Sequence, residues 1–197
     1  MELFAETGFR GTSLQRVAEQ VGLSQAGLLH HFGSKSQLLA DVLQRRDDLD
    51  ADSVFHGEIP GGWATFEQFI EIVRRNTTTP GLVRLYVTLS GEAVDPEHPG
   101  HAWLAGHYQR VVSRLTAALQ DGIATGTVRP ETPCEAVARS VTALMDGLQL
   151  QWLMDPENVD MVTAVSDFVG ALRCRWELTS GSISNPSLRQ SCSDQTR

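Results

Sequence analysis

The stretch that decides the fold is TSLQRVAEQVGLSQAGLLHHFGSKSQLL, which runs from Thr12 to Leu39. Two places in it have the spacing of a capping box, in which a Ser or Thr hydroxyl accepts a hydrogen bond from the first helical turn and a Gln three residues later reaches back. The pairs are Thr12 with Gln15 and Ser34 with Gln37. We therefore predict that one helix begins at Thr12 and another at Ser34.

Between these two starts, the pattern indicates a short helix, a tight turn and a second short helix. Apolar residues recur at helical spacing at Leu14, Val17, Ala18 and Val21. Gly22 follows, where a helix ends because glycine adopts the left-handed conformation at little cost. Ser24 is the next candidate N-cap, and residues 25–32 span about two turns. This order is that of a helix-turn-helix, whose second helix lies in the major groove of DNA.

A wider set of residues in this region falls in a characteristic order. It comprises Gly8-Phe9, Thr12-Ser13-Leu14, Val17-Ala18, Val21-Gly22-Leu23-Ser24, Leu28, His31-Phe32, Ser34-Lys35 and Leu38-Leu39. This pattern resembles the N-terminal domain of TetR-family transcriptional regulators. The resemblance implies an all-α fold with an N-terminal helix-turn-helix three-helix domain, expected over residues 1–46. A larger helical ligand-binding and dimerisation domain is expected over residues 47–178.

The sequence departs from the family pattern at two places. The chain opens at Met1, so fewer than two turns precede Gly8. Either the first helix is truncated or the true start lies upstream. Leu29 occupies a position where the family usually has Tyr, which removes a hydroxyl that often contacts the DNA backbone. The alternative function, which follows from a truncated first helix, is a helical small-molecule-binding or dimerisation protein that has lost DNA binding.

The resemblance also implies which residues contact DNA. Base edges would be contacted by Gln15, Gln25, Ala26 and Leu29, and phosphates by Ser13, Gly27, His30, His31 and Lys35. The chemistry agrees, because Gln pairs bidentately with adenine and an Ala methyl touches the thymine methyl. The alternative is that Gln15 and Gln25 are ordinary solvated helix residues, and that one of His30 and His31 packs beneath the domain. His30 and His31 are not a metal pair, since adjacent helical residues point about 100° apart.

Charge is distributed unevenly along the chain. The net charge is −8, from 16 Lys and Arg against 24 Asp and Glu. Residues 1–46 hold five basic and four acidic side chains, so the acidic excess lies outside the expected reading head. DNA binding would then depend on a few well-placed contacts, helix N-termini and the doubling of sites in a dimer.

Other function classes find no support in the sequence. Cys134, Cys174 and Cys192 are widely spaced, which favours reduced thiols over a disulfide framework or a zinc site. No phosphate-binding loop, metal-ligand spacing or nucleophile motif occurs, so we expect no enzyme, no cofactor and no metal. Without a leader or an apolar run of spanning length, we expect a cytoplasmic protein with no membrane partner.

The rest of the chain has the apolar periodicity of helices. Four or five are expected after the helix that begins at Ser34, with breaks at residues 94–100, 125–127 and 155–156. Residues 179–197 are polar and Ser-rich without an apolar face, which predicts a disordered tail.

The last two helices, over residues 137–152 and 162–172, are expected to form an antiparallel hairpin. The resemblance implies that two such hairpins form a four-helix dimer interface, and we assign to it Val137, Val141, Leu144, Leu148, Val162, Val165, Phe168, Val169 and Leu172. Further apolar residues lie on additional faces at Ala143, Leu150, Leu153 and Met161. The alternative is a core within one subunit.

Aromatic and polar residues on the same helices indicate an effector pocket. The candidates are Trp63, Phe66, Phe69, Tyr86, Trp103, His107, Tyr108, Met145, Gln149 and Trp152. Polar groups on apolar stripes need partners or a ligand, although ordinary core packing is the alternative for each aromatic. We expect a homodimer on a pseudo-palindromic operator in double-stranded DNA. A small-molecule effector, apolar or aromatic, would release this repressor from it.

Overall fold

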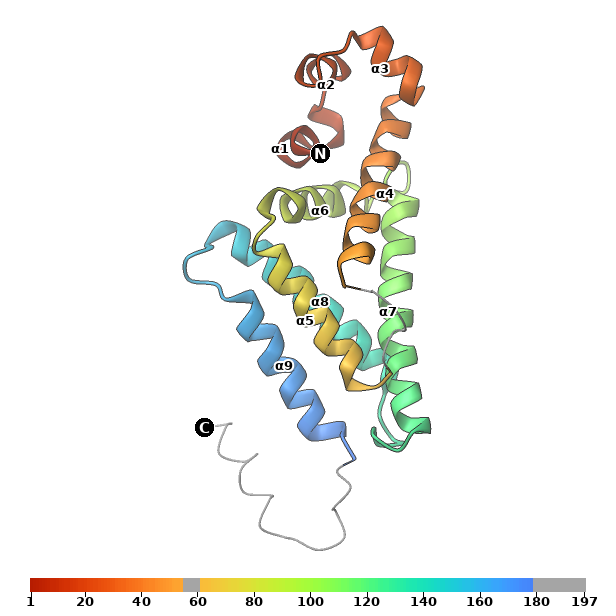
Figure 1. Ribbon diagram of the computed structural model, residues 1–197, viewed down its shortest axis with the longest axis vertical. Coiled ribbons are helices and arrows are strands. Elements are labelled where there is room, and N and C mark those ends of the chain that lie inside the picture. Colours follow the sequence, from red (N-terminus) through yellow and green to blue (C-terminus); the bar gives the residue numbers. More distant parts are fainter. Residues whose placement is uncertain (55–60, 179–197) are drawn as a thin grey trace, which may run out of the picture.

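The computed structural model describes residues 1–54 and 61–178, and this part of the chain is built from α-helices (Figure 1). The N-terminal helices are α1 (Glu2–Gly11), α2 (Leu14–Gln20), α3 (Gln25–Phe32) and α4 (Lys35–Val54). The body consists of α5 (Trp63–Asn76), α6 (Pro80–Glu92), α7 (His101–Ala124), α8 (Cys134–Met154) and α9 (Met161–Trp176). Within the described ranges the only β pairing is an isolated bridge between Val128 and Glu177. The all-α prediction is confirmed, and the tail predicted at 179–197 lies outside the described residues.

Serine side chains begin the two helices of the predicted reading motif. Ser13 accepts a hydrogen bond from the N–H of Arg16 at 3.1 Å, and Ser24 accepts one from Gly27 at 3.0 Å. The predicted cap at Thr12 is therefore wrong by one residue. The Thr12 hydroxyl is buried and donates to the Gly8 carbonyl at 2.6 Å instead.

The second predicted capping box is only half formed. The Ser34 hydroxyl accepts from the N–H of Gln37 at 3.1 Å, as a cap does. The Gln37 amide does not reach back, because it donates to Asp41 one turn ahead at 3.0 Å. The turn between α2 and α3 follows the prediction, with Gly22 at φ +71°.

One apolar core joins the head to the body. Phe4, Ala18, Leu28 and Leu39 from α1 to α4 pack together with Leu85 and Leu89 of α6. Helix α6 lies directly beneath α1 (Figure 1). The domain boundary predicted after residue 46 falls inside the continuous helix α4. A movement of α6 would therefore displace the side chains of the head that pack against it.

The body has a second, larger core. Helix α8 packs between α7 and α9, and α5 packs on α7 and α9. Their buried side chains include Phe66, Leu115, Leu119, Val141 and Val165. Pro80 begins α6, and α8 ends at Met154, directly before the break predicted at residues 155–156. Among the described residues, no helix is both long and apolar enough to cross a bilayer.

Candidate DNA-reading head and effector site

Helix α3 presents one polar face to solvent and one apolar residue to the head core. Gln25, Ala26, His30 and His31 are exposed, whereas Leu28 is buried. Gly27 and Leu29 are half-buried. Because α3 has only eight residues, it depends on the Ser24 cap and on Leu28 to hold its position. The exposed side chains are free to meet a groove of DNA without disturbing the core.

Residues beside α3 have partners within the head. The Gln15 amide donates to Glu19 along the exposed side of α2 at 2.9 Å, and the Ser13 hydroxyl caps α2. The Lys35 ammonium lies 3.4 Å from the Arg10 carbonyl and 4.7 Å from the centre of the Phe9 ring. Lys35 therefore connects the end of α1 to the start of α4. The phosphate contact predicted for Lys35 stays a prediction.

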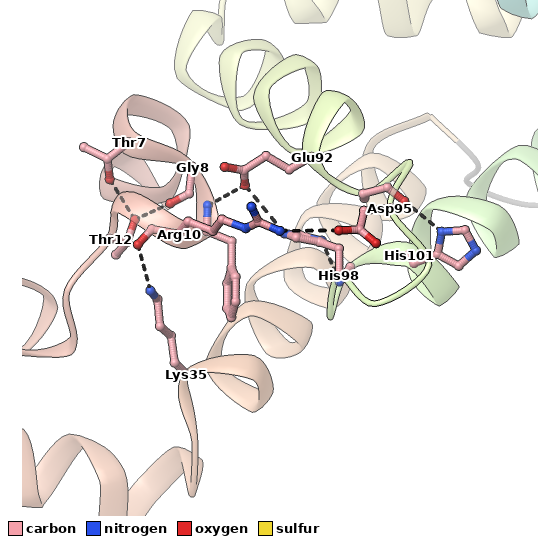
Figure 2. A network of polar contacts seen from close by, with 12 residues as sticks. Thr7, Gly8, Arg10, Thr12, Lys35, Glu92, Asp95, His98 and His101 are labelled. Carbon is pink, nitrogen blue, oxygen red and sulfur yellow. Dashed lines mark hydrogen bonds and ion pairs between the residues drawn. The ribbon is translucent and has the colours of Figure 1, made fainter.

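The junction between head and body is polar around Glu92, the last residue of α6 (Figure 2). Its carboxylate accepts a hydrogen bond from the backbone N–H of Phe9 at 2.6 Å. This N–H is available because Gly8, at φ +66° and ψ −175°, interrupts α1. Arg10 pairs with Asp95 at 3.3 Å nearby, but both side chains are largely exposed.

A buried histidine supports Glu92 from the loop after α6. The His98 Nδ1 accepts from the N–H of Gly100 at 3.0 Å, so its hydrogen is on Nε2 in the neutral ring. Nε2 lies 3.5 Å from the Glu92 carboxylate, and the ring meets Phe9 edge-on at 5.2 Å. The sequence did not single out Glu92, and it predicted His98 to be a loop residue. The one available signal was Gly8, a glycine inside a predicted helix.

In the body, aromatic residues of α6 and α7 surround a carboxylate of α8. The Tyr86 hydroxyl donates to one Asp146 oxygen at 3.2 Å, and the Tyr108 hydroxyl donates to the other at 2.7 Å. Burial raises the pKa of Tyr108 above its ordinary value, and Asp146 raises it further despite an opposing hydrogen bond from Tyr86. Asp146 was not predicted, although it is the one acidic residue within the apolar stretch after Glu135.

The rings themselves are in contact. Trp103 and His107 are stacked with centroids 5.3 Å apart, and Tyr86 meets His107 at 5.4 Å. The structure thus brings together Tyr86, Trp103, His107 and Tyr108 of the predicted pocket. Gln149 is buried one turn beyond Asp146, and its Oε1 has no hydrogen-bond partner among the described residues.

The remaining pocket candidates lie in the large core. Trp63 and Phe66 pack against each other with centroids 5.3 Å apart. Phe69 and Trp152 are buried in the same cluster, and Met145 packs partly buried against it. These residues support the body through packing, and their contact with an effector stays a prediction.

Five of the nine residues predicted for the dimer interface are buried within their own chain. Val141 and Val165 are 0% and 1% exposed to solvent and belong to the core of their own chain. Val137, Val169 and Leu148 are likewise buried, whereas Leu144, Val162, Phe168 and Leu172 are partly covered. On α8 and α9, the apolar stripe faces α5 and α7 of the same chain. The most regular spacing of apolar residues therefore marks the face that packs within the subunit.

The outward faces of α8 and α9 consist of other residues. Leu150 and Met154 are 50% and 78% exposed on α8, and Ala143 is exposed on the same helix. Gly170 and Ala171 are exposed on α9. Met161, which the sequence placed on an additional face, is instead buried.

Comparison with known proteins agrees with this architecture. Residues 1–42 match the model for bacterial regulatory proteins of the tetR family, and residues 69–173 match the model for the C-terminal domain of BetI-type transcriptional repressors. The chain belongs to the TetR family. This confirms the family and the fold that the resemblance implied.

Individual relatives are distant. The chain is 31% identical over 116 residues to the HTH-type transcriptional repressor KstR2 of Rhodococcus jostii, an alignment that covers 58% of this chain and 47% of that protein. It is 26% identical to the regulatory protein RaaS of Mycobacterium tuberculosis, over 85% and 74% of the two chains. A TetR regulator structure from Chloroflexus aurantiacus superposes with a TM-score of 0.77 at 21% identity, covering 90% of this chain and 92% of that one.

As a TetR-family protein, the chain is a ligand-responsive DNA-binding transcriptional regulator and not an enzyme. Regulators of this family bind operator DNA and small-molecule effectors and work as dimers. The prediction of a helix-turn-helix regulator is therefore confirmed.

Proposed function

We propose that this TetR regulator is a repressor whose α3 reads DNA and whose aromatic cluster around Asp146 binds the releasing effector. The observation that carries the proposal is the position of α6 between these two sites. Tyr86 of α6 donates to Asp146, whereas the adjacent Leu85 is buried in the head core. One thirteen-residue helix therefore touches both sites.

The end of the same helix sets the position of α1. Glu92 accepts the Phe9 N–H, and Thr88 donates to the Ala5 carbonyl at 3.2 Å. An effector that shifts Tyr86 would displace these contacts and change the orientation of the head. By linkage, DNA must weaken effector binding by the same factor that the effector weakens DNA binding.

Two heads must act together for specific binding. We assign the dimer interface to the outward faces of α8 and α9, because Leu150 and Met154 leave apolar surface uncovered there. A two-fold dimer with heads about 34–36 Å apart reads a pseudo-palindromic operator. Gln25 and Ala26, at the exposed start of α3, are placed to contact its bases.

The test begins with selection of bound sequences from a random DNA library. The wild type should yield a palindromic motif, and Gln25→Ala should lose about 1–3 kcal/mol of base discrimination at one position of each half-site. Gln120→Ala, at an exposed site of α7 far from the head, is the matched control and should leave the motif unchanged. An unaltered motif with Gln25→Ala would contradict the assignment of α3 as the reading helix. Failure of the wild type to enrich any motif would favour the alternative protein that does not read DNA.

A further inference from the structure

Glu92 lies at the end of α6, where the helix itself disfavours an acidic side chain. The last carbonyl groups of a helix carry partial negative charge, so a cation is stabilised beside them and an anion is not. The last turn of α6, residues 89–92, contains no basic residue that would compensate. The Glu92 carboxylate therefore depends on donors from outside α6 to hold its position.

Two donors from different parts of the chain converge on one oxygen of this carboxylate (Figure 2). The Phe9 N–H of α1 donates to Glu92 Oε2 at 2.6 Å, and Nε2 of His98 lies 3.5 Å from the same atom. The first contact is a charge-assisted hydrogen bond, which is the strong kind. The second is longer than the usual N–H···O hydrogen bond, so it is the attraction of an N–H dipole for a charge.

The His98 ring is itself fixed in place. Its side chain is 2% exposed, its Nδ1 accepts the Gly100 N–H, and its backbone N–H donates to the Asp95 carbonyl at 3.0 Å. Nε2 has no hydrogen-bond partner in the described part of the chain. Movement of Glu92 away from the ring would remove the carboxylate that attracts this buried donor, and an unpaired buried donor destabilises a protein. His98 therefore opposes movement of Glu92.

A directional contact matters at this junction because apolar packing does not fix an angle. Leu85 and Leu89 of α6 pack against the head, but burial of apolar surface is non-directional. Arg10 and Asp95 form an ion pair whose side chains are 80% and 45% exposed, so it contributes little. The short charged contact at Glu92 therefore restrains the angle between α1 and α6.

We propose that His98 is a positioning residue for operator binding, which holds the Glu92 carboxylate on the Phe9 N–H and so fixes the angle of the reading head on the body. The inference rests on the proposed function in one respect, that two heads of a dimer read one palindrome. It is independent of where the effector binds. Both half-sites are matched only when each head keeps its angle, so a loosened head loses selectivity for the spacing of the half-sites.

This spacing gives a readout that a folding defect does not reproduce. The DNA probe is the palindrome that the wild type selects, compared with versions that have one base pair inserted or removed at the centre. Each such change alters the separation of the half-sites by about 3.4 Å and their rotation by about 35°. Fluorescence anisotropy on the full-length dimer should show that the wild type prefers the selected spacing.

The first variant is His98→Asn. An Asn side chain accepts an N–H two residues ahead, as in an Asx-turn, so it keeps the bond to Gly100 but is too short to reach Glu92. We expect the preference for the selected spacing to fall about tenfold, from about threefold in each of the two heads. Affinity for a single half-site should change less than about twofold, because one head on its own needs no partner at a fixed angle.

His101→Asn is the matched control from the same loop. The His101 ring contacts the Ala93 carbonyl at 2.8 Å, and its replacement should leave the spacing preference at the wild-type value. Glu92→Gln tests the path, because it keeps the shape of the side chain and removes the charge. It should lose spacing preference as His98→Asn does, and the double variant should lose no more than either alone. Glu92→Gln also carries the test if His98→Asn does not fold.

Hydrogen exchange supplies a second measurement, since the Phe9 amide should exchange about threefold or more faster in His98→Asn. A wild-type spacing preference in His98→Asn would overturn the proposal, and so would an equal loss of affinity for the single half-site and the palindrome. Additive losses in the double variant would show that His98 does not act through Glu92. A wild type that binds its palindrome without any spacing preference would also contradict the proposal. Failure of the wild type to select a palindrome would instead contradict the proposed function.

Discussion

At the scale of single residues, the contact between Gly8 and Glu92 decides how the head sits on the body. Gly8 combines positive φ with extended ψ, a conformation essentially restricted to glycine. A Cβ at this position would overlap the Glu92 carboxylate, whose Cδ would lie 2.8 Å away. The absence of a side chain thus lets α6 reach the Phe9 N–H.

We predict that Gly8→Ala lowers the free energy of unfolding by about 3 kcal/mol or more, from backbone strain and overlap together. Gly22→Ala is a control for positive φ without overlap, because no atom lies within 4 Å of the would-be Cβ of Gly22. The control should cost about 1–2 kcal/mol. Urea unfolding followed by circular dichroism measures both. Equal losses would show that Glu92 moves aside without cost.

At the scale of elements, the caps decide which short helices persist. Asp160 begins α9, where one carboxylate oxygen accepts the Thr163 N–H at 3.0 Å and the other accepts the Thr163 hydroxyl at 2.7 Å. The backbone N–H of Thr163, and then its hydroxyl, hold the pKa of Asp160 below its ordinary value. The ionised form is the better acceptor for both donors.

This pKa shift predicts a pH-dependent contribution to stability. A carboxyl with a lowered pKa in the folded state stabilises the protein fully above its unfolded pKa of about 4, and this contribution is lost as pH falls through the folded value. Asp160→Asn keeps a capping acceptor but no charge. The difference in melting temperature between wild type and Asp160→Asn should therefore shrink from pH 7 toward acid. A constant difference would contradict the charged cap, and Asp160→Ala should be less stable than Asp160→Asn at neutral pH.

At the scale of the whole molecule, function depends on two heads held by one dimer. Because Val165 is buried in its own subunit, a charge there would unfold the body instead of separating subunits. The double variant Ala143→Glu with Leu150→Glu places charges on the exposed face of α8 instead. We expect folded monomers whose operator affinity falls at least about a hundredfold, because each head alone retains only half of the contacts.

Light scattering reports the mass of this variant, and far-UV circular dichroism reports its fold. Ala102→Glu adds a charge at an exposed site in the first turn of α7 and should remain dimeric. A double variant that stays dimeric would place the interface elsewhere on the molecule.

The helical fold and the reading motif could be predicted from the sequence, because they depend on local rules. Caps such as Ser24, the left-handed turn at Gly22 and the periodic apolar residues act within a few residues of one another. The resemblance to the family, and not periodicity, assigned DNA contacts to Gln25, Ala26, His30 and His31, which are exposed on α3. Local rules also place the start of α6 and the end of α8, because Pro80 suits a first helical position and Pro156, which has no N–H, follows the C-cap residue Asp155.

Which helical faces pack against each other became known only from the packed structure. Apolar periodicity reports that a face is buried but not what covers it, so Val141 and Val165 were assigned to a partner and are in fact covered by their own chain. Asp146 and Tyr86 are 60 residues apart, and Phe9 and Glu92 are 83 apart. No sequence spacing predicts such pairs, because they form where helices that are distant in the sequence pack against each other. The proposed effector site and its connection to the head are products of packing.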